Sequence, residues 1–262
     1  MPKSLQEGQG DIKIKPEIRL LSEQYADEGI AQGAQAALLL GSYVRGDFYP
    51  ESDVDITLVG EGLSYRLERS GDRLVSISWR SAENIRQSMQ NPAEVGGLIP
   101  AIRGSYILMD PMGVAGELKK EANDWSWDPI GDQCNAWVAE EITGFSEEVH
   151  RLVGNLRLGR FGIAAVVRNV LSIRLATILA VHHRILYETE NRLWDLVNLE
   201  MGDAWTRVQQ SAFGMGQESF QDTCRSALEL YYLAANDVKS LLNERQSGVV
   251  RHACLIAGFP NL

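Results

Sequence analysis

The pattern of the sequence changes at residues 122–130, and this change limits the fold more than any other feature. The segment Ala122-Asn-Asp-Trp-Ser-Trp-Asp-Pro-Ile130 has no helical or strand periodicity. Before it, short apolar or alternating runs typical of strands are interspersed with amphipathic runs typical of helices. After it, every periodic segment is helical. We therefore expect an α+β protein with two domains, 1–125 and 126–262, because 262 residues suffice for two hydrophobic cores.

The first domain is predicted to contain a mixed β-sheet flanked by helices, after a polar segment at 1–15. Strands are expected at 36–40, 53–59, 74–79 and 105–109, and helices at 16–32, 82–90, 96–103 and 113–121. The second domain is predicted to be a helical bundle, because its long helical segments are joined by short turns. These helices are expected at 132–158, 161–187, 192–199, 203–214 and 218–244.

Composition limits the partners and the location. The net charge of −10 and the absence of a basic stripe disfavour nucleic acid as a partner. An acidic chain suits a small cationic substrate, although acidity can also serve solubility alone. Cys134, Cys224 and Cys254 lack the spacing of a disulfide framework or a zinc site. The apolar stretch 173–185 contains charged side chains and is too short to span a membrane, and the N-terminal residues lack a signal peptide. We expect a cytoplasmic protein with no membrane partner.

The segment 38–59 contains the residues whose types and spacing indicate a phosphate-binding and metal-binding site. A predicted strand ends at Gly41, and Ser42 begins a helical turn whose backbone N–H groups and hydroxyl are available for phosphate oxygens. Arg45 follows one turn later and can add a positive charge for the same phosphates. Asp53 and Asp55 are two residues apart on the next strand, so both carboxylates lie on one face. A hard divalent ion such as Mg²⁺ would relieve their repulsion, which predicts a metal site.

The combination of strand, Gly-Ser, Arg, Ser52-Asp53-Val54-Asp55 and strand resembles the signature of the polymerase-β-like nucleotidyltransferases. Further segments resemble the kanamycin nucleotidyltransferase family, which are two-domain aminoglycoside 4′-adenylyltransferases. They are Thr177–Thr189 in the second domain, Glu147 standing before Gly159, and residues 71–78. The likeness extends over most of the chain.

This resemblance implies a role for each matching residue. Gly41, Ser42 and Arg45 would bind the nucleotide, with ATP as co-substrate, and Asp53 and Asp55 would be catalytic residues that hold Mg²⁺. Glu147 would be the base that takes the proton from the acceptor hydroxyl, and Arg151 beside it would contact phosphate. The resemblance also implies a homodimer.

One departure from the family pattern concerns the third carboxylate. Family members commonly carry it on the strand predicted at 74–79, where this chain has Ser76, with Ser78 on the same face. A serine cannot hold a metal as an anion does, so this part of the metal site is weakened or absent. Asp72 could lean in from the start of the strand, and Glu147 could supply the base from the second domain.

The expected function is Mg²⁺-dependent transfer of AMP from ATP to a hydroxyl of a small cationic acceptor, an aminoglycoside, which would confer antibiotic resistance. Glu94, Glu141 and Glu147 would suit the ammonium groups of such an acceptor. The alternatives are adenylylation of another small molecule, such as a lincosamide, or of a protein side chain. A further alternative is a nucleotide-binding protein of the antitoxin type without catalysis. His182 and His183 have no carboxylate one turn away on their own helix and are expected to be core or interface residues.

Overall fold

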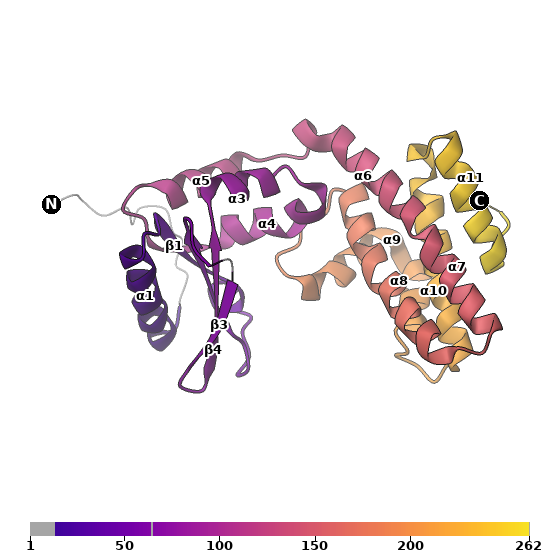
Figure 1. Cartoon of the computed structure of the whole chain (residues 1–262), viewed down its shortest axis with the longest axis horizontal. Helices are drawn as coiled ribbons and strands as arrows, with labels where there is room; N and C mark the ends of the chain where they lie inside the picture. The colour runs from indigo at the N-terminus through magenta and orange to yellow at the C-terminus, as the bar shows by residue number, and fades with distance from the viewer. Residues whose placement is uncertain (1–13, 64, 262) are drawn as a thin grey trace. The chain divides into compact units, whose positions relative to one another are not determined.

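The chain divides between Ser126 and Trp127 into two compact units, one built around a sheet and one helical (Figure 1). The computed structural model describes residues 14–63 and 65–261, so most of the polar segment predicted at 1–15 lies outside the described residues. The first unit contains α1 (Pro16–Ala31), β1 (Ala36–Leu40), α2 (Ser42–Arg45), β2 (Val54–Val59), β3 (Tyr65–Ser70), β4 (Arg73–Arg80), α3 (Ala82–Ser88), α4 (Pro92–Gly104), β5 (Tyr106–Met109) and α5 (Val114–Asp124). The second contains η1 (Asp128–Ile130), α6 (Gly131–Gly144), α7 (Ser146–Arg157), α8 (Phe161–His182), α9 (Glu190–Ala212), α10 (Phe220–Val238), η2 (Lys239–Leu241) and α11 (Glu244–Ala257).

The strands of the first unit form one mixed sheet in the order β3-β4-β2-β1-β5. β2 and β4 are parallel, and the other neighbouring pairs are antiparallel. α1 packs against β1, β2 and β5, while α4 and α5 also contact β1. The residues of β2 that join α1 in the core are Val54, Ile56 and Leu58. Because side chains alternate along a strand, Asp55 and Thr57 lie on the opposite face of the sheet.

The mixed sheet and the strands at 36–40, 53–59, 74–79 and 105–109 are confirmed, each within two residues at its ends. The strand β3 was not predicted. Its side chains alternate between exposed and half-buried, so the strand contributes no fully buried side chain that would mark it in the sequence. β3 forms a hairpin with β4, in which Tyr65 pairs with Ser78 and Leu67 with Ser76.

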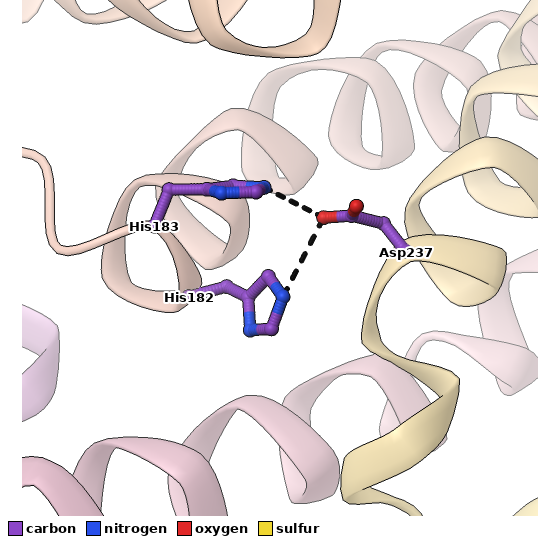
Figure 2. A group of neighbouring side chains, drawn as sticks. All are labelled: His182, His183 and Asp237. Carbon is purple, nitrogen blue, oxygen red and sulfur yellow. Dashed lines mark hydrogen bonds and ion pairs between the residues drawn. The ribbon is translucent and has the colours of Figure 1, made fainter.

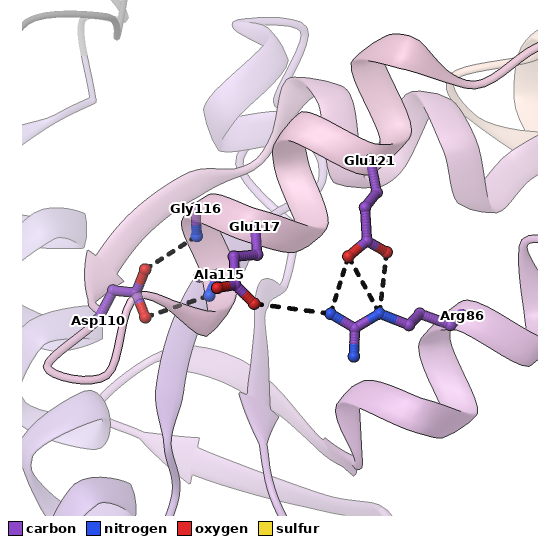
Figure 3. Close-up of polar contacts among 6 residues, drawn as sticks. All are labelled: Arg86, Asp110, Ala115, Gly116, Glu117 and Glu121. Atoms are coloured by element: carbon purple, nitrogen blue, oxygen red, sulfur yellow. Dashed lines mark hydrogen bonds and ion pairs between the residues drawn. The ribbon is translucent and has the colours of Figure 1, made fainter.

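Helix α5 is attached to its neighbours by charged side chains (Figure 3). The two carboxylate oxygens of Asp110 accept hydrogen bonds from the backbone N–H groups of Ala115 (3.1 Å) and Gly116 (2.8 Å). These groups lie in the first turn of α5, where a helix has no internal acceptor for them. Farther along α5, Glu121 accepts from both the Nε and an Nη of Arg86 on α3. These contacts hold α5 to α3 and to the segment that follows β5.

Helix α8 is the centre of the second unit, where it packs against α6, α7, α9 and α10. Within the described residues it is the one helix long and apolar enough to cross a membrane by length and composition. The sequence interpretation considered only residues 173–185 and called that stretch too short and too charged to span; the helix that contains most of it has 22 residues. Half of its most apolar window is buried inside the protein, as in the core helix of a soluble domain.

The helix boundaries predicted in the second unit differ from the structure in four places. The helix predicted at 161–187 ends at His182. The helix predicted at 132–158 is two helices, α6 and α7, which meet at Phe145 after the poor helix former Gly144. The helices predicted at 192–199 and 203–214 are the two parts of α9, which is interrupted at Gly202 (φ 79°, ψ −173°). The helix predicted at 218–244 ends at Val238, and α11 was not predicted.

Candidate active site

Gly41 sits at the point where β1 turns into the short helix α2. Its φ of 77° is in the region that favours glycine. A β-carbon at this position would lie 3.1 Å from the carboxylate carbon of Asp55 and closer still to its Oδ2. The Asp55 carboxylate therefore rests against the backbone of Gly41. This contact leaves no space for a side chain, so glycine is required here both by its conformation and by its neighbour.

The residues after Gly41 form a single helical turn, Ser42–Arg45, which ends at the left-handed Gly46. Ser42 and Arg45 are half-buried. Arg45 forms an ion pair with Asp47 at 3.2 Å. It also lies close enough to Asp55 to lower the pKa of that carboxyl group, against the larger effects that raise it. The residues predicted to contact phosphate, which start at Gly41, thus lie next to the acidic pair Asp53 and Asp55.

The loop that leads into Asp53 is held by local contacts. The buried Ser52 accepts a hydrogen bond from the Tyr49 backbone N–H at 3.0 Å, and its own N–H donates to the Tyr49 carbonyl at 3.0 Å. Tyr43 of α2 stacks on Phe48, with ring centroids 4.8 Å apart. These contacts tie the loop to α2 and fix where β2 begins.

Asp53 and Asp55 lie together, and Ser76 is their neighbour on β4. Asp55 pairs with Ser76 in the parallel register of β2 and β4 and accepts a hydrogen bond from its hydroxyl group. The pKa of Asp55 is raised to about 6, mainly by burial and next by the negative charge of Asp53, while Arg45 and the hydrogen bond from Ser76 oppose this shift. The site thus holds two carboxylates that are insufficiently compensated by nearby positive charge. This donor set fits a hard divalent cation, which would stabilise the charged form of both.

Residues 31–91 match the nucleotidyltransferase domain family. This part of the chain is a nucleotidyltransferase domain. The match includes Gly41, Ser42, Arg45, Asp53 and Asp55, and it indicates transfer of a nucleotidyl group in general. A nucleotidyltransferase-like protein from Exiguobacterium sibiricum 255-15, known from a crystal structure, is similar over 92% of this chain and 77% of its own, with 10% sequence identity and a TM-score of 0.49. No curated protein matches the chain.

Asp72 does not replace the third carboxylate within the nucleotidyltransferase domain. It lies exposed in the turn between β3 and β4. Four residues of extended strand, about 13 Å, separate it from Ser76. Ser76 therefore contributes a hydroxyl group but no charge at the position beside Asp55.

A polar cavity of about 540 Å³ lies farther along β4 in the first unit. Ser78 and Arg80 line it, and they share the sheet face of Ser76 because they follow it at intervals of two residues. Glu94, which was expected to suit a cationic acceptor, lies in this cavity. Its carboxylate is 3.5 Å from Arg80 Nη2 and accepts a hydrogen bond from Asn91 at 2.6 Å. The sequence did not indicate this cavity, because its lining comes from β4, α3 and the start of α4.

Glu147 and Arg151 belong to the second unit. Glu147 is exposed in the first turn of α7. Arg151, expected to act beside it, instead donates hydrogen bonds to both carboxylate oxygens of Glu148, at 2.7 and 2.9 Å. Glu141 is 3.6 Å from Arg174 and is partly compensated by it. The roles of Glu147 and Arg151 in nucleotidyl transfer remain predictions from the sequence.

Proposed function

We propose that the protein transfers AMP from ATP to a hydroxyl group of a small cationic acceptor, an aminoglycoside antibiotic, with Mg²⁺ held by Asp53 and Asp55. The observation that carries the proposal is the Asp55 carboxylate against Gly41 with the Asp53 carboxylate beside it, inside a nucleotidyltransferase domain. The acidic net charge of −10 favours a cationic acceptor over a nucleic acid. We further propose that the protein acts in the cytoplasm as a homodimer and confers resistance.

The proposed reaction requires positioning more than covalent chemistry from the protein. Gly41, Ser42 and Arg45 hold and orient the triphosphate. Glu147 accepts the proton of the acceptor hydroxyl while the hydroxyl oxygen forms a bond to the α-phosphorus of ATP. The bond between that phosphorus and the leaving pyrophosphate breaks in the same step. Arg151 contributes a phosphate contact beside Glu147. When bound at Asp53 and Asp55, Mg²⁺ supplies positive charge that stabilises the developing charge on the phosphates.

Purified protein incubated with radiolabelled ATP, Mg²⁺ and a panel of aminoglycosides tests this function. We expect labelled AMP on at least one aminoglycoside and a higher inhibitory concentration of that drug for bacteria that express the protein. Asp53→Asn should abolish transfer, whereas the matched change Asp72→Asn, in an exposed turn of the same domain, should leave it unchanged.

Different failures have different meanings. Transfer to a lincosamide or to a protein, and to no aminoglycoside, would contradict the proposed acceptor. Full activity of Asp53→Asn would contradict the proposed site. ATP binding without transfer to any acceptor would instead indicate the nucleotide-binding, antitoxin-type alternative.

A further inference from the structure

Two adjacent histidines meet one aspartate at one end of the helical unit (Figure 2). His182 is the last residue of α8, His183 follows it, and Asp237 lies one residue before the end of α10. One oxygen of Asp237, Oδ2, is 2.7 Å from His183 Nε2 and 3.6 Å from His182 Nε2. The sequence could not indicate this group, because the carboxylate comes from a different helix.

We propose that His182, His183 and Asp237 bind one transition-metal ion of the borderline class, such as Zn²⁺, Co²⁺ or Ni²⁺. One ligand atom from each residue lies within 4.8 Å of the other two. In a tetrahedral zinc site with bonds near 2.05 Å, neighbouring ligand atoms are about 3.3 Å apart. The observed spacings of 2.7 and 3.6 Å lie on either side of that value. Small rotations of the side chains therefore suffice to coordinate an ion.

The contacts of His182 favour a metal over a purely structural hydrogen-bond network. Its Nε2 is beyond hydrogen-bond distance from Asp237, at 3.6 Å. His182 Nε2 therefore makes no direct hydrogen bond to this carboxylate. An ion bound between Nε2 and the carboxylate supplies an interaction that the two side chains do not make with each other.

A second carboxylate supports the orientation of His183. Glu200 of α9 lies 3.4 Å from His183 Nδ1, the ring nitrogen that does not face Asp237. A metal-binding histidine usually donates its other ring N–H to a carboxylate, which fixes the ring and raises its basicity. The side chains of His182, His183 and Asp237 are 19%, 21% and 28% exposed, so an ion can reach them from solvent.

The ligand types separate this site from the one at Asp53 and Asp55. Two imidazoles and one carboxylate suit zinc, cobalt or nickel, whereas Mg²⁺ prefers oxygen ligands alone. The ligands come from α8 and α10, and Glu200 adds α9. A bound ion would therefore join the end of α8 to the end of α10, with Glu200 of α9 supporting His183, and stabilise the folded state of the second unit.

Calorimetric titration of the metal-free full-length protein with Zn²⁺, and with Co²⁺ followed by visible absorption, tests the proposal. We expect one ion per chain and a cobalt spectrum typical of tetrahedral coordination. Asp237→Asn and His183→Gln should weaken binding at least tenfold. Glu200→Gln should weaken it about tenfold without changing the stoichiometry.

The other two of the four histidines provide the matched control. His150 and His252 also face each other, with ring centroids 5.3 Å apart on α7 and α11. The double variant His150→Gln/His252→Gln should bind the ion as the wild type does. Loss of binding in this control and its retention in Asp237→Asn would overturn the proposal, as would the absence of binding to the wild-type protein.

A measurement on the wild-type protein keeps the test decisive if a variant fails to fold. Histidine modification by diethyl pyrocarbonate, located by peptide mass spectrometry, should be suppressed by Zn²⁺ at His182 and His183 and not at His150 and His252. Equal modification of His182 and His183 with and without Zn²⁺ would contradict the site.

Discussion

At the scale of single residues, the site depends on the contact between Gly41 and Asp55. Gly41 has a positive φ, and its α-carbon faces the Asp55 carboxylate at a distance that leaves no space for a β-carbon. The carboxylate in turn is buried, near Asp53, and hydrogen-bonded by Ser76. Its position and its charge state are therefore set by different neighbours, and each can be changed separately.

Gly41→Ala should displace the Asp55 carboxylate and reduce nucleotidyl transfer by at least about 10²-fold, because misplacement of a catalytic group by 1 Å can cost this much. Steady-state kinetics measures the effect. Gly46→Ala is the control, because Gly46 also has a positive φ (85°), but a β-carbon there would meet no atom of the described residues within 4 Å. Equal losses in both variants would show that backbone strain, and not the contact with Asp55, is responsible.

The pKa of Asp55, about 6, predicts a specific dependence of stability on pH. Because burial raises this pKa above the unfolded value of 3.8, the contribution of Asp55 to stability is present below about pH 4 and is lost as pH rises through 6. Without divalent ions, Asp55→Asn should therefore gain in melting temperature relative to the wild type between about pH 5 and 7.5. Mg²⁺ should stabilise the wild type at the higher pH and not the variant. If the difference in melting temperature between the wild type and Asp55→Asn were the same at about pH 5 and at about pH 7.5, the raised pKa of Asp55 would be contradicted.

At the scale of secondary-structure elements, the first turn of α5 depends on Asp110 (Figure 3). Asp110→Ala removes the acceptor for two backbone N–H groups and should cost about 1 kcal/mol, as the loss of an N-terminal cap does. Hydrogen exchange of the peptide covering residues 110–124 should become faster. Asp124→Ala, which removes only an exposed i,i+4 ion pair with Lys120, should change it little. Equally fast exchange in both variants would contradict a capping role.

Some strands could be predicted because buried positions are occupied by apolar residues, which gives the sequence a continuous or alternating apolar pattern. All four of Ala36 to Leu39 are buried between helices on both faces of the sheet, so β1 is a continuous apolar run. β4 is covered on one face and alternates between apolar and polar residues. β3 has no buried side chain, and its formation depends on pairing with β4, so its sequence carried no comparable mark. Ser81 caps the start of α3, because its hydroxyl accepts a hydrogen bond from the Asn84 N–H at 3.1 Å.

At the scale of the whole molecule, the proposed function combines the nucleotidyltransferase domain with a base from the helical unit. Glu147→Gln should lower kcat by about 10²–10⁴-fold, the usual contribution of general-base catalysis, and leave the Kd for ATP nearly unchanged. Rapid-quench kinetics and calorimetry separate the two quantities. Glu148→Gln, at the neighbouring residue that accepts from Arg151, is the control. A near wild-type kcat for Glu147→Gln would show that another group takes the proton.

The sequence by itself determined the features that arise from local order along the chain. The spacing of Asp53 and Asp55 puts both on one face of a strand, and the change of pattern at 122–130 separates a mixed sheet from helices. Only the tertiary structure decided which groups meet across long separations. Ser76 reaches Asp55 because β2 and β4 pair in parallel, and Asp237 meets His182 and His183 because α10 packs against α8. The physical reason is that burial and charge act through space, whereas periodicity acts along the chain.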